Sequence, residues 1–100
     1  MTAEKGQMLI VLAYEKDLLI GYCIASLVEE VGEIDSIFVS ENYRKCGIAT
    51  CLMDTSLHWL KQNNPIKTVV KVSIGNEDVF GFYARYGFLP RLTELQMISR

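Results

Sequence analysis

Two basic residues and a turn of small residues stand together at Arg44-Lys45-Cys46-Gly47-Ile48-Ala49. A strand-like apolar segment precedes them, and a helical pattern of apolar residues follows directly. The first amides of a helix have no partner inside it, and the helix dipole adds partial positive charge at the same end. Because Gly47 lets the backbone approach a bulky group, the segment suits a phosphate. A plain structural turn explains it at least as well.

Two acidic residues interrupt the strand-like segment that runs from Glu33 to Val39. Strict alternation predicts one face with Glu33, Asp35, Ile37 and Val39, and an opposite face with Ile34, Ser36 and Phe38. Burial and mutual repulsion would raise the pKa values of the two carboxyl groups, as suits a general base. The alternative is that both acids face solvent or a basic substrate groove.

Hydrophobic patterns predict the elements that must position these residues. They are strands over Met8–Tyr14, Leu18–Val28 and Glu33–Val39, a helix from Gly47 to about Asn63, a strand over Ile66–Ile74, a helix over Glu77–Tyr86 and a final strand within Leu95–Ile98. Gly21 is expected to mark a bulge in the first hairpin. The order β-β-β-α-β-α-β predicts an α/β fold of the α+β type, with helices packed on a mixed sheet.

Composition narrows the class of protein. One hundred residues suit a single domain over residues 1–100, and a net charge of −2 gives no basic surface for nucleic acid or anionic membrane. No apolar run is long enough to span a bilayer. The three cysteines form no C-x-x-C pair, so we expect reduced thiols, no metal site and a cytoplasmic location.

Two motifs carry a family resemblance. Arg44-x-x-Gly47-x-Ala49 resembles R/Q-x-x-G-x-G/A, the pyrophosphate-binding signature of the GNAT acetyltransferases. Asn76, Tyr83 and Gly87-Phe88 keep the spacing of that family's N-x₆-Y-x-x-x-G-F element. The resemblance covers roughly Gly6 to the C-terminus, and two motifs in the right order make it far more specific than either one alone.

The resemblance implies a GNAT-type fold and an N-acetyltransferase that moves an acetyl group from acetyl-CoA to a primary amine of a small molecule or protein. It needs no metal. The loop amides would hold the coenzyme A pyrophosphate, and the strand before the loop would hydrogen-bond the pantetheine arm. The implied coenzyme-binding residues are Ile37, Phe38, Val39, Arg44, Lys45, Cys46, Gly47, Ile48, Ala49, Thr50, Asn76 and Tyr83.

The resemblance also suggests catalytic roles. Tyr83 would protonate the leaving thiolate, although a core tyrosine would fit the same aromatic segment. Glu33 would be the general base, with Asp35 nearly as good a choice. Asn76 would contact the coenzyme, cap the following helix, or do both. Cys46 is either an oxidisable thiol or a passive loop residue.

The chain departs from the family pattern at its N-terminus. Family members usually begin with a strand and two helices before the first hairpin, whereas about seven residues precede it here. We therefore expect an N-terminally truncated GNAT-like fold whose uncovered sheet face is buried in a homodimer. The alternative function is a catalytically silent acyl-CoA-binding or regulatory module that dimerises.

Overall fold

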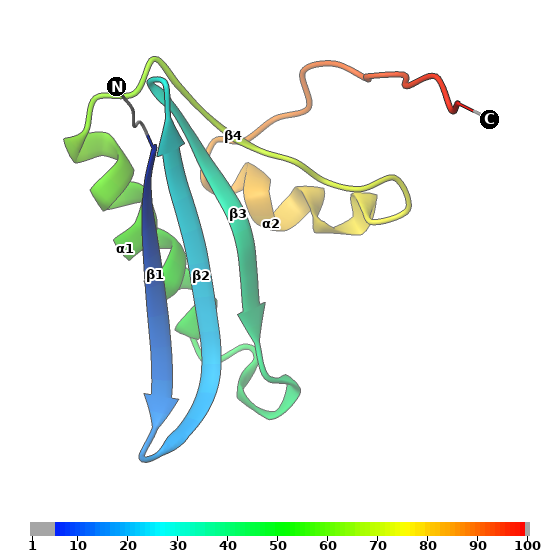
Figure 1. Ribbon diagram of the computed structural model, residues 1–100. Coiled ribbons are helices and arrows are strands. Elements are labelled where there is room, and N and C mark those ends of the chain that lie inside the picture. Colours follow the sequence, from blue (N-terminus) through cyan, green and yellow to red (C-terminus); the bar gives the residue numbers. More distant parts are fainter. Residues whose placement is uncertain (1–5, 100) are drawn as a thin grey trace.

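The computed structural model describes residues 6–99. Its elements are β1 (Gly6–Glu15), β2 (Leu18–Val28), β3 (Val31–Val39), a 3₁₀ turn (Glu41–Tyr43), α1 (Ile48–Gln62), β4 (Lys67–Val70), a second 3₁₀ turn (Glu77–Val79) and α2 (Phe80–Ala84) (Figure 1). The first three strands and α1 lie close to their predicted positions. Asn63 ends α1, as expected from the polar Asn-Asn-Pro sequence that follows the helix.

The four strands form one mixed sheet in the order β1-β2-β3-β4. β1, β2 and β3 pair antiparallel, and β4 pairs parallel with β3, so the predicted α+β mixed sheet is confirmed. The turn between β2 and β3 has Glu29 and Glu30 at φ 51° and 69°. Positive φ at both central residues is the geometry of a type I′ turn, which is one of the two turns favoured in two-residue hairpins.

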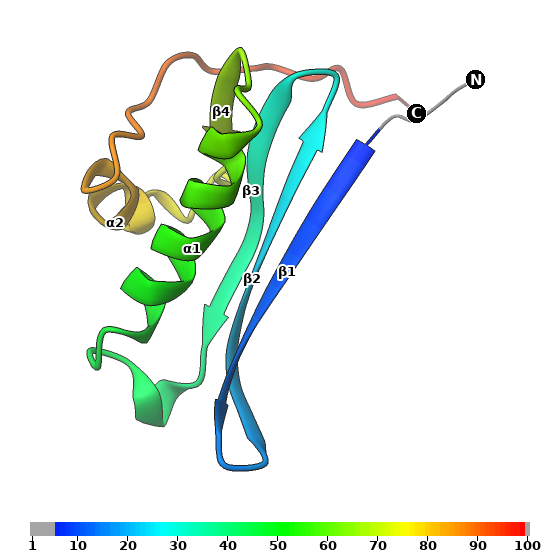
Figure 2. The same ribbon diagram turned by 90° about the vertical axis from the view of Figure 1, so that its left-hand side faces the viewer.

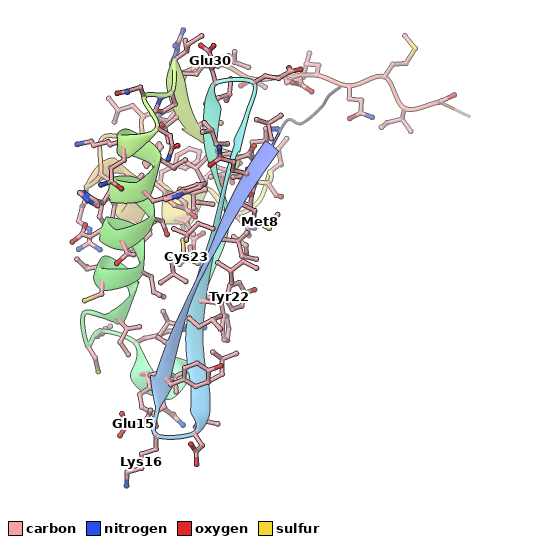
Figure 3. The ribbon with its side chains drawn as sticks, turned by 60° about the vertical axis from the view of Figure 1, so that its left-hand side comes forward. Met8, Glu15, Lys16, Tyr22, Cys23 and Glu30 are labelled. Carbon is pink, nitrogen blue, oxygen red and sulfur yellow. The ribbon has the colours of Figure 1, made fainter. Side chains whose placement is uncertain are left out.

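Both helices lie on the same side of the sheet (Figure 2). The core between the sheet and α1 consists of Cys23, Ala25, Ile34, Val39, Leu52, Met53 and Leu60. Figure 3 shows Cys23 on the side of the sheet that faces α1, with Tyr22 and Met8 on the opposite side. The core is therefore one layer between a sheet and a helix.

A β-bulge at Asp35 overturns the predicted alternation of the third strand. Ala25 pairs with Ile34 and Ile24 pairs with Ser36, so Asp35 is an extra residue without a partner on β2. Ile34 and Val39 both reach the core, which an unbroken alternation would forbid. Glu33 therefore does not share a face with Ile37 and Val39. Cross-strand pairing places it with Ser36 and Phe38 instead.

A second bulge lies beside Gly21, where one was predicted. Ala13 pairs with Gly21 and Tyr14 pairs with Leu19, which leaves Ile20 as the extra residue. A Cβ atom on Gly21 would lie 2.9 Å from the carbonyl oxygen of Phe38. Glycine is therefore required here, because only a residue without a side chain allows the backbones of β2 and β3 to approach this closely.

The C-terminal third differs most from the predictions. β4 ends at Val70 rather than Ile74, and the predicted helix over Glu77–Tyr86 is a 3₁₀ turn followed by a five-residue helix. The predicted final strand is wrong, because residues 88–99 contain no strand and run away from the sheet (Figure 1). Leu95 and Met97 are 88% and 91% exposed. A segment forms a strand only where a neighbouring backbone can pair with its amides.

The side of the sheet opposite the helices carries a continuous set of apolar residues, here called the outer face. Its members are Met8, Ile10, Leu12, Tyr14, Leu19, Tyr22, Ile24 and Phe38, which the strand register places together. Met8 is 63% exposed, Tyr14 is 58% exposed and Phe38 is 45% exposed. A patch of this size on a protein surface usually marks a contact surface.

Candidate functional site

A hollow of about 370 Å³ opens where β3, the start of α1 and α2 converge. Its lining residues are Ile37, Phe38, Val39, Arg44, Ala49, Val79 and Phe82. Five of these seven were predicted from the sequence as coenzyme-binding residues. The structure thus brings together the end of the third strand and the glycine loop, which the sequence separates by a polar turn.

The strands diverge beside this hollow. Only Val31–Ile34 of β3 pair with β4, and beyond Val70 the chain turns away from β3 (Figure 1). Among the described residues, the edge of β3 from Asp35 to Val39 therefore has no strand beside it. Backbone groups on such an edge are available to pair with an extended ligand, as they would be with another strand.

The loop between β3 and α1 presents backbone amides at the same place. Lys45 and Gly47 have φ values of 64° and 83°, and Gly47 is the N-cap of α1. The first helical hydrogen bond runs from the Cys51 amide to the Gly47 carbonyl oxygen at 3.1 Å. The amides of Ile48, Ala49 and Thr50 therefore have no partner within the helix, which makes this end a site for an anion.

Arg44 and Lys45 place two cationic side chains at this loop. The Arg44 Nε–H donates to the Val39 carbonyl oxygen at 2.9 Å, and Arg44 also lines the hollow. Lys45 is exposed. The Cys46 thiol lies 3.6 Å from the Arg44 carbonyl oxygen, a weak contact on the surface. Positive charge beside partnerless amides strengthens the attraction for a phosphate group.

Tyr83 is half-buried on α2 and does not line the hollow. Its ring packs edge-on against Phe82 and Phe88, at centroid distances of 5.2 and 6.1 Å. Burial raises the pKa of the Tyr83 hydroxyl above its usual value, and the nearby Cys23 raises it further. Tyr83 is therefore a neutral phenol at physiological pH, which is the form that can donate a proton.

The structure separates the two acids that the sequence grouped together. Glu33 lies 3.8 Å from the Lys71 ammonium, and its side chain is 24% exposed. Asp35 is exposed at the bulge. Neither lines the hollow. Lys71 is thus a charged partner of Glu33 that the sequence analysis did not predict.

Asn76 immediately precedes the second 3₁₀ turn, in the N-cap position. Its side chain makes no capping hydrogen bond, and the turn is closed by the Val79 amide donating to the Asn76 carbonyl oxygen at 3.1 Å. Nearby, the Gly75 amide donates to Glu77 Oε1 at 3.0 Å. The capping alternative is therefore correct in position but wrong in mechanism.

Two lining residues, Val79 and Phe82, were missed by sequence reasoning. Helical spacing offered a signal, since Val79, Phe82 and Tyr86 recur every three to four residues through the second 3₁₀ turn, α2 and the turn that follows it. Tyr86 also donates from its hydroxyl to Thr50 Oγ1 at 3.3 Å. That bond links the end of α2 to the first turn of α1, beside the loop amides.

The comparison with protein families decides the identity of this arrangement. The family model described as the acetyltransferase (GNAT) family matches residues 2–88. The chain belongs to the GNAT acetyltransferase family. Membership makes this GNAT protein an acyltransferase, and it confirms the resemblance that the two sequence motifs indicated. None of the curated protein sequences compared with it matches.

Solved structures show the same fold. The aminoglycoside acetyltransferase AAC(6')-Iy bound to a bisubstrate analogue, CoA-S-monomethyl-acetylneamine, is 20% identical, with a TM-score of 0.76 over 98% of this chain and 71% of that one. The 6'-N-acetyltransferase AAC(6')-IG from Acinetobacter haemolyticus is 21% identical, with a TM-score of 0.76 over 98% and 72%. The PaiA N-acetyltransferase from Thermoplasma acidophilum, in complex with coenzyme A, is 21% identical, with a TM-score of 0.77 over 87% and 55%.

At these identities the similarity establishes the fold of this GNAT protein. In the part of the chain that the structure describes, no helix is long and apolar enough to cross a membrane.

Proposed function

We propose that this GNAT protein transfers an acetyl group from acetyl-CoA to a primary amine of a small molecule or protein. The observation that carries the proposal is the meeting of two backbone features at one hollow. Within residues 6–99, no strand lies beside the β3 edge from Asp35 to Val39, and this edge leads to the amides that begin α1 and have no partner within that helix. An extended amide-containing arm that ends in a diphosphate fits both features.

In this proposal, acetyl-CoA binds with its pantetheine arm along β3 and its diphosphate at the loop. Ile37, Phe38 and Val39 contact the arm, and Arg44 to Thr50 surround the diphosphate. Val79 and Phe82 form the opposite wall of the hollow. Asn76 and Tyr83 remain coenzyme contacts on the strength of the family motif alone, since neither lines the hollow.

The reaction requires two proton transfers. A free amine with a pKa of about 10.4 is protonated at neutral pH and must lose a proton before it can attack the thioester carbonyl. Its nitrogen then forms the amide bond as the carbon–sulfur bond breaks, and the leaving thiolate takes the proton of Tyr83. Bound acetyl-CoA supplies the activated acyl group.

Asp35 is the better of the two candidate bases. It lies close enough to Cys23 to help raise the pKa of that thiol, and Cys23 in turn helps to raise the pKa of Tyr83. Asp35 also follows directly on the last residue of β3 that pairs with β4, so it stands at the start of the edge proposed to hold the pantetheine arm. Glu33 is already engaged with Lys71. We accordingly favour Asp35 as proton acceptor, with Glu33 as second choice.

The test measures free CoA thiol released from acetyl-CoA in the presence of a panel of amines. The proposal expects amine-dependent release, and Tyr83→Phe should lower kcat by about 10²- to 10⁴-fold, the usual contribution of a positioned acid. Tyr14→Phe removes a hydroxyl from an exposed tyrosine outside the hollow and serves as the control. Binding of acetyl-CoA without turnover on any amine would instead favour the silent regulatory module.

The proposal includes a homodimer in the cytoplasm. The eight outer-face side chains are large and mostly exposed, and at about 150–250 Å² for a full-sized aromatic side chain they offer on the order of 700 Å². A standard interface needs roughly 800 Å² per partner, so a second copy packed on this face supplies the right area. The three free cysteines support a reducing compartment.

A further inference from the structure

The peptide unit that joins Val39 to Ser40 is held at both of its polar groups. The Ser40 amide donates to the Ile20 carbonyl oxygen at 2.7 Å. The Val39 carbonyl oxygen accepts from the Arg44 Nε–H at 2.9 Å. The first bond ties the unit to β2, and the second ties it to a side chain five residues further along the chain.

This peptide unit terminates the unpaired part of the β3 edge. From Asp35 onward no strand from the described part of the chain lies on that side, so the edge depends on β2 and on its own end for its shape. Val39 is 8% exposed and anchored in the core, whereas Ser40 begins the turn. The Arg44 bond therefore acts at the boundary between a fixed strand and a surface loop.

We propose that Arg44 is a positioning residue, which fixes the β3 edge for the pantetheine arm through the Val39 carbonyl group. This role is additional to any attraction of its charge for the diphosphate, and it rests on the proposed use of acetyl-CoA. Nε is one of five guanidinium N–H donors, so the terminal nitrogens stay available for an anion while Nε holds the backbone.

Two substitutions separate the two roles. Glutamine carries an N–H donor the same number of bonds from the backbone as Arg44 Nε, but it has no charge. Lysine keeps the charge and puts a methylene group where Nε stood. Arg44→Gln therefore preserves the bond to Val39 and removes the cation, and Arg44→Lys does the reverse. Lys45→Gln removes the neighbouring cation, which makes no such bond, and is the matched charge control.

The first readout uses no ligand. Amide hydrogen exchange at Ser40 reports the state of the held peptide unit, because that amide belongs to the same unit as the Val39 carbonyl group. We expect Arg44→Lys to speed exchange at Ser40 by about three- to tenfold, the usual effect of losing one hydrogen bond. Arg44→Gln and Lys45→Gln should leave it within about twofold. Equal exchange rates in all four proteins would overturn the proposal.

The second readout compares coenzyme A with pantetheine, which lacks the diphosphate, in titrations followed by NMR. Arg44→Lys should weaken pantetheine binding by about three- to tenfold, whereas Arg44→Gln and Lys45→Gln should weaken only coenzyme A binding. Unchanged pantetheine binding in Arg44→Lys would reduce Arg44 to a diphosphate contact and contradict the proposal. If the unaltered protein bound neither compound, the proposed coenzyme use would fail, and Ser40 exchange would still decide whether Arg44 holds β3.

Discussion

Gly47 is the residue on which the proposed anion site depends most directly. Its φ of 83° lies in the left-handed region, and a Cβ atom there would meet nothing within 4 Å. Glycine is needed for the backbone angle and not for space. This position therefore separates conformational strain from steric blockage, which most glycine substitutions combine.

We expect Gly47→Ala to lower the free energy of unfolding by about 1–2 kcal/mol, because an L-residue in that region is strained. The same substitution should weaken coenzyme A binding, since relief of the strain would move the first amides of α1. Urea unfolding and calorimetry measure the two effects. Gly81→Ala, in α2 and also free of clashes, is the control and should be neutral or stabilising. Equal losses in both variants would contradict the assignment.

Cys23 gives the protein a predictable response to alkaline pH. Burial raises the pKa of its thiol above the usual 9.0, and the charge of Asp35 raises it further. Below pH 9.0 the thiol is protonated in both folded and unfolded chains. Above it, the unfolded chain loses the proton while the folded chain keeps it, so stability must fall as pH rises.

The expected result is a decline in the free energy of unfolding as the pH rises above 9.0, measured by urea denaturation at constant ionic strength. Cys23→Ala should reduce the slope of this decline, although it lowers stability at every pH by leaving a small cavity. Cys51→Ala, which alters an exposed thiol, should keep the slope of the unaltered protein. A slope unaffected by Cys23→Ala would show that another group causes the loss.

Among the elements, β3 shows best what the sequence could and could not reveal. The sequence predicted its end at Val39 correctly and its start, Val31, to within two residues, but it did not predict which side chains share a face. The bulge at Asp35 shifts the inward and outward alternation of side chains by one residue. Because Ile34 and Val39 are both apolar, their residue types do not reveal whether they face the same side of the strand. Local composition carries no mark of an extra residue when the partner strand is unknown. The prediction that Glu33 and Asp35 share a face with Ile37 and Val39 therefore failed.

The bulge itself can be tested by deletion. Without Asp35, Ile34 would be followed by Ser36, and a regular alternation would still place Ile34 and Val39 in the core. We therefore expect the deletion variant to fold, with circular dichroism like that of the parent. It should nevertheless lose acetyl transfer, because bulges beside active sites direct backbone and side chains toward the ligand. Full activity in a folded deletion variant would argue against any role of the bulge.

The helices and the C-terminal segment mark the other limits of prediction. α1 was predictable because its apolar spacing and its glycine start are local signals. The glycine loop was likewise found from sequence, because its motif is contiguous. Val79 and Phe82 were missed because α2 is short and its partners are distant. Leu95–Ile98 has the composition of a strand, but composition cannot supply the neighbouring backbone that pairing requires.

At the scale of the whole molecule, the outer face determines the expected oligomeric state. Leu12 and Tyr22 are paired near the middle of the outer face, and Leu12 is 47% exposed. A carboxylate placed there would have to lose its water if a second copy packed over it. We therefore expect the protein to be a dimer at micromolar concentration and Leu12→Glu to be a monomer.

Analytical ultracentrifugation checks this expectation. Thr55→Glu on the exposed side of α1 introduces the same charge away from the outer face and should remain dimeric. A monomeric parent protein would rule out the homodimer, and the apolar surface would then require another partner. Dimers of both variants would place the interface elsewhere on the chain.

The parting of β3 from β4 has an energetic consequence. Only Val31–Ile34 of β3 pair with β4. A ligand bound along the rest of this edge would pair with the β3 backbone as an additional strand does. Saturation at 100 times the dissociation constant would add about 2.7 kcal/mol to the unfolding free energy, visible as a higher melting temperature. The protein without ligand would then be the less stable form, and the concentration of coenzyme would determine its resistance to unfolding and proteolysis.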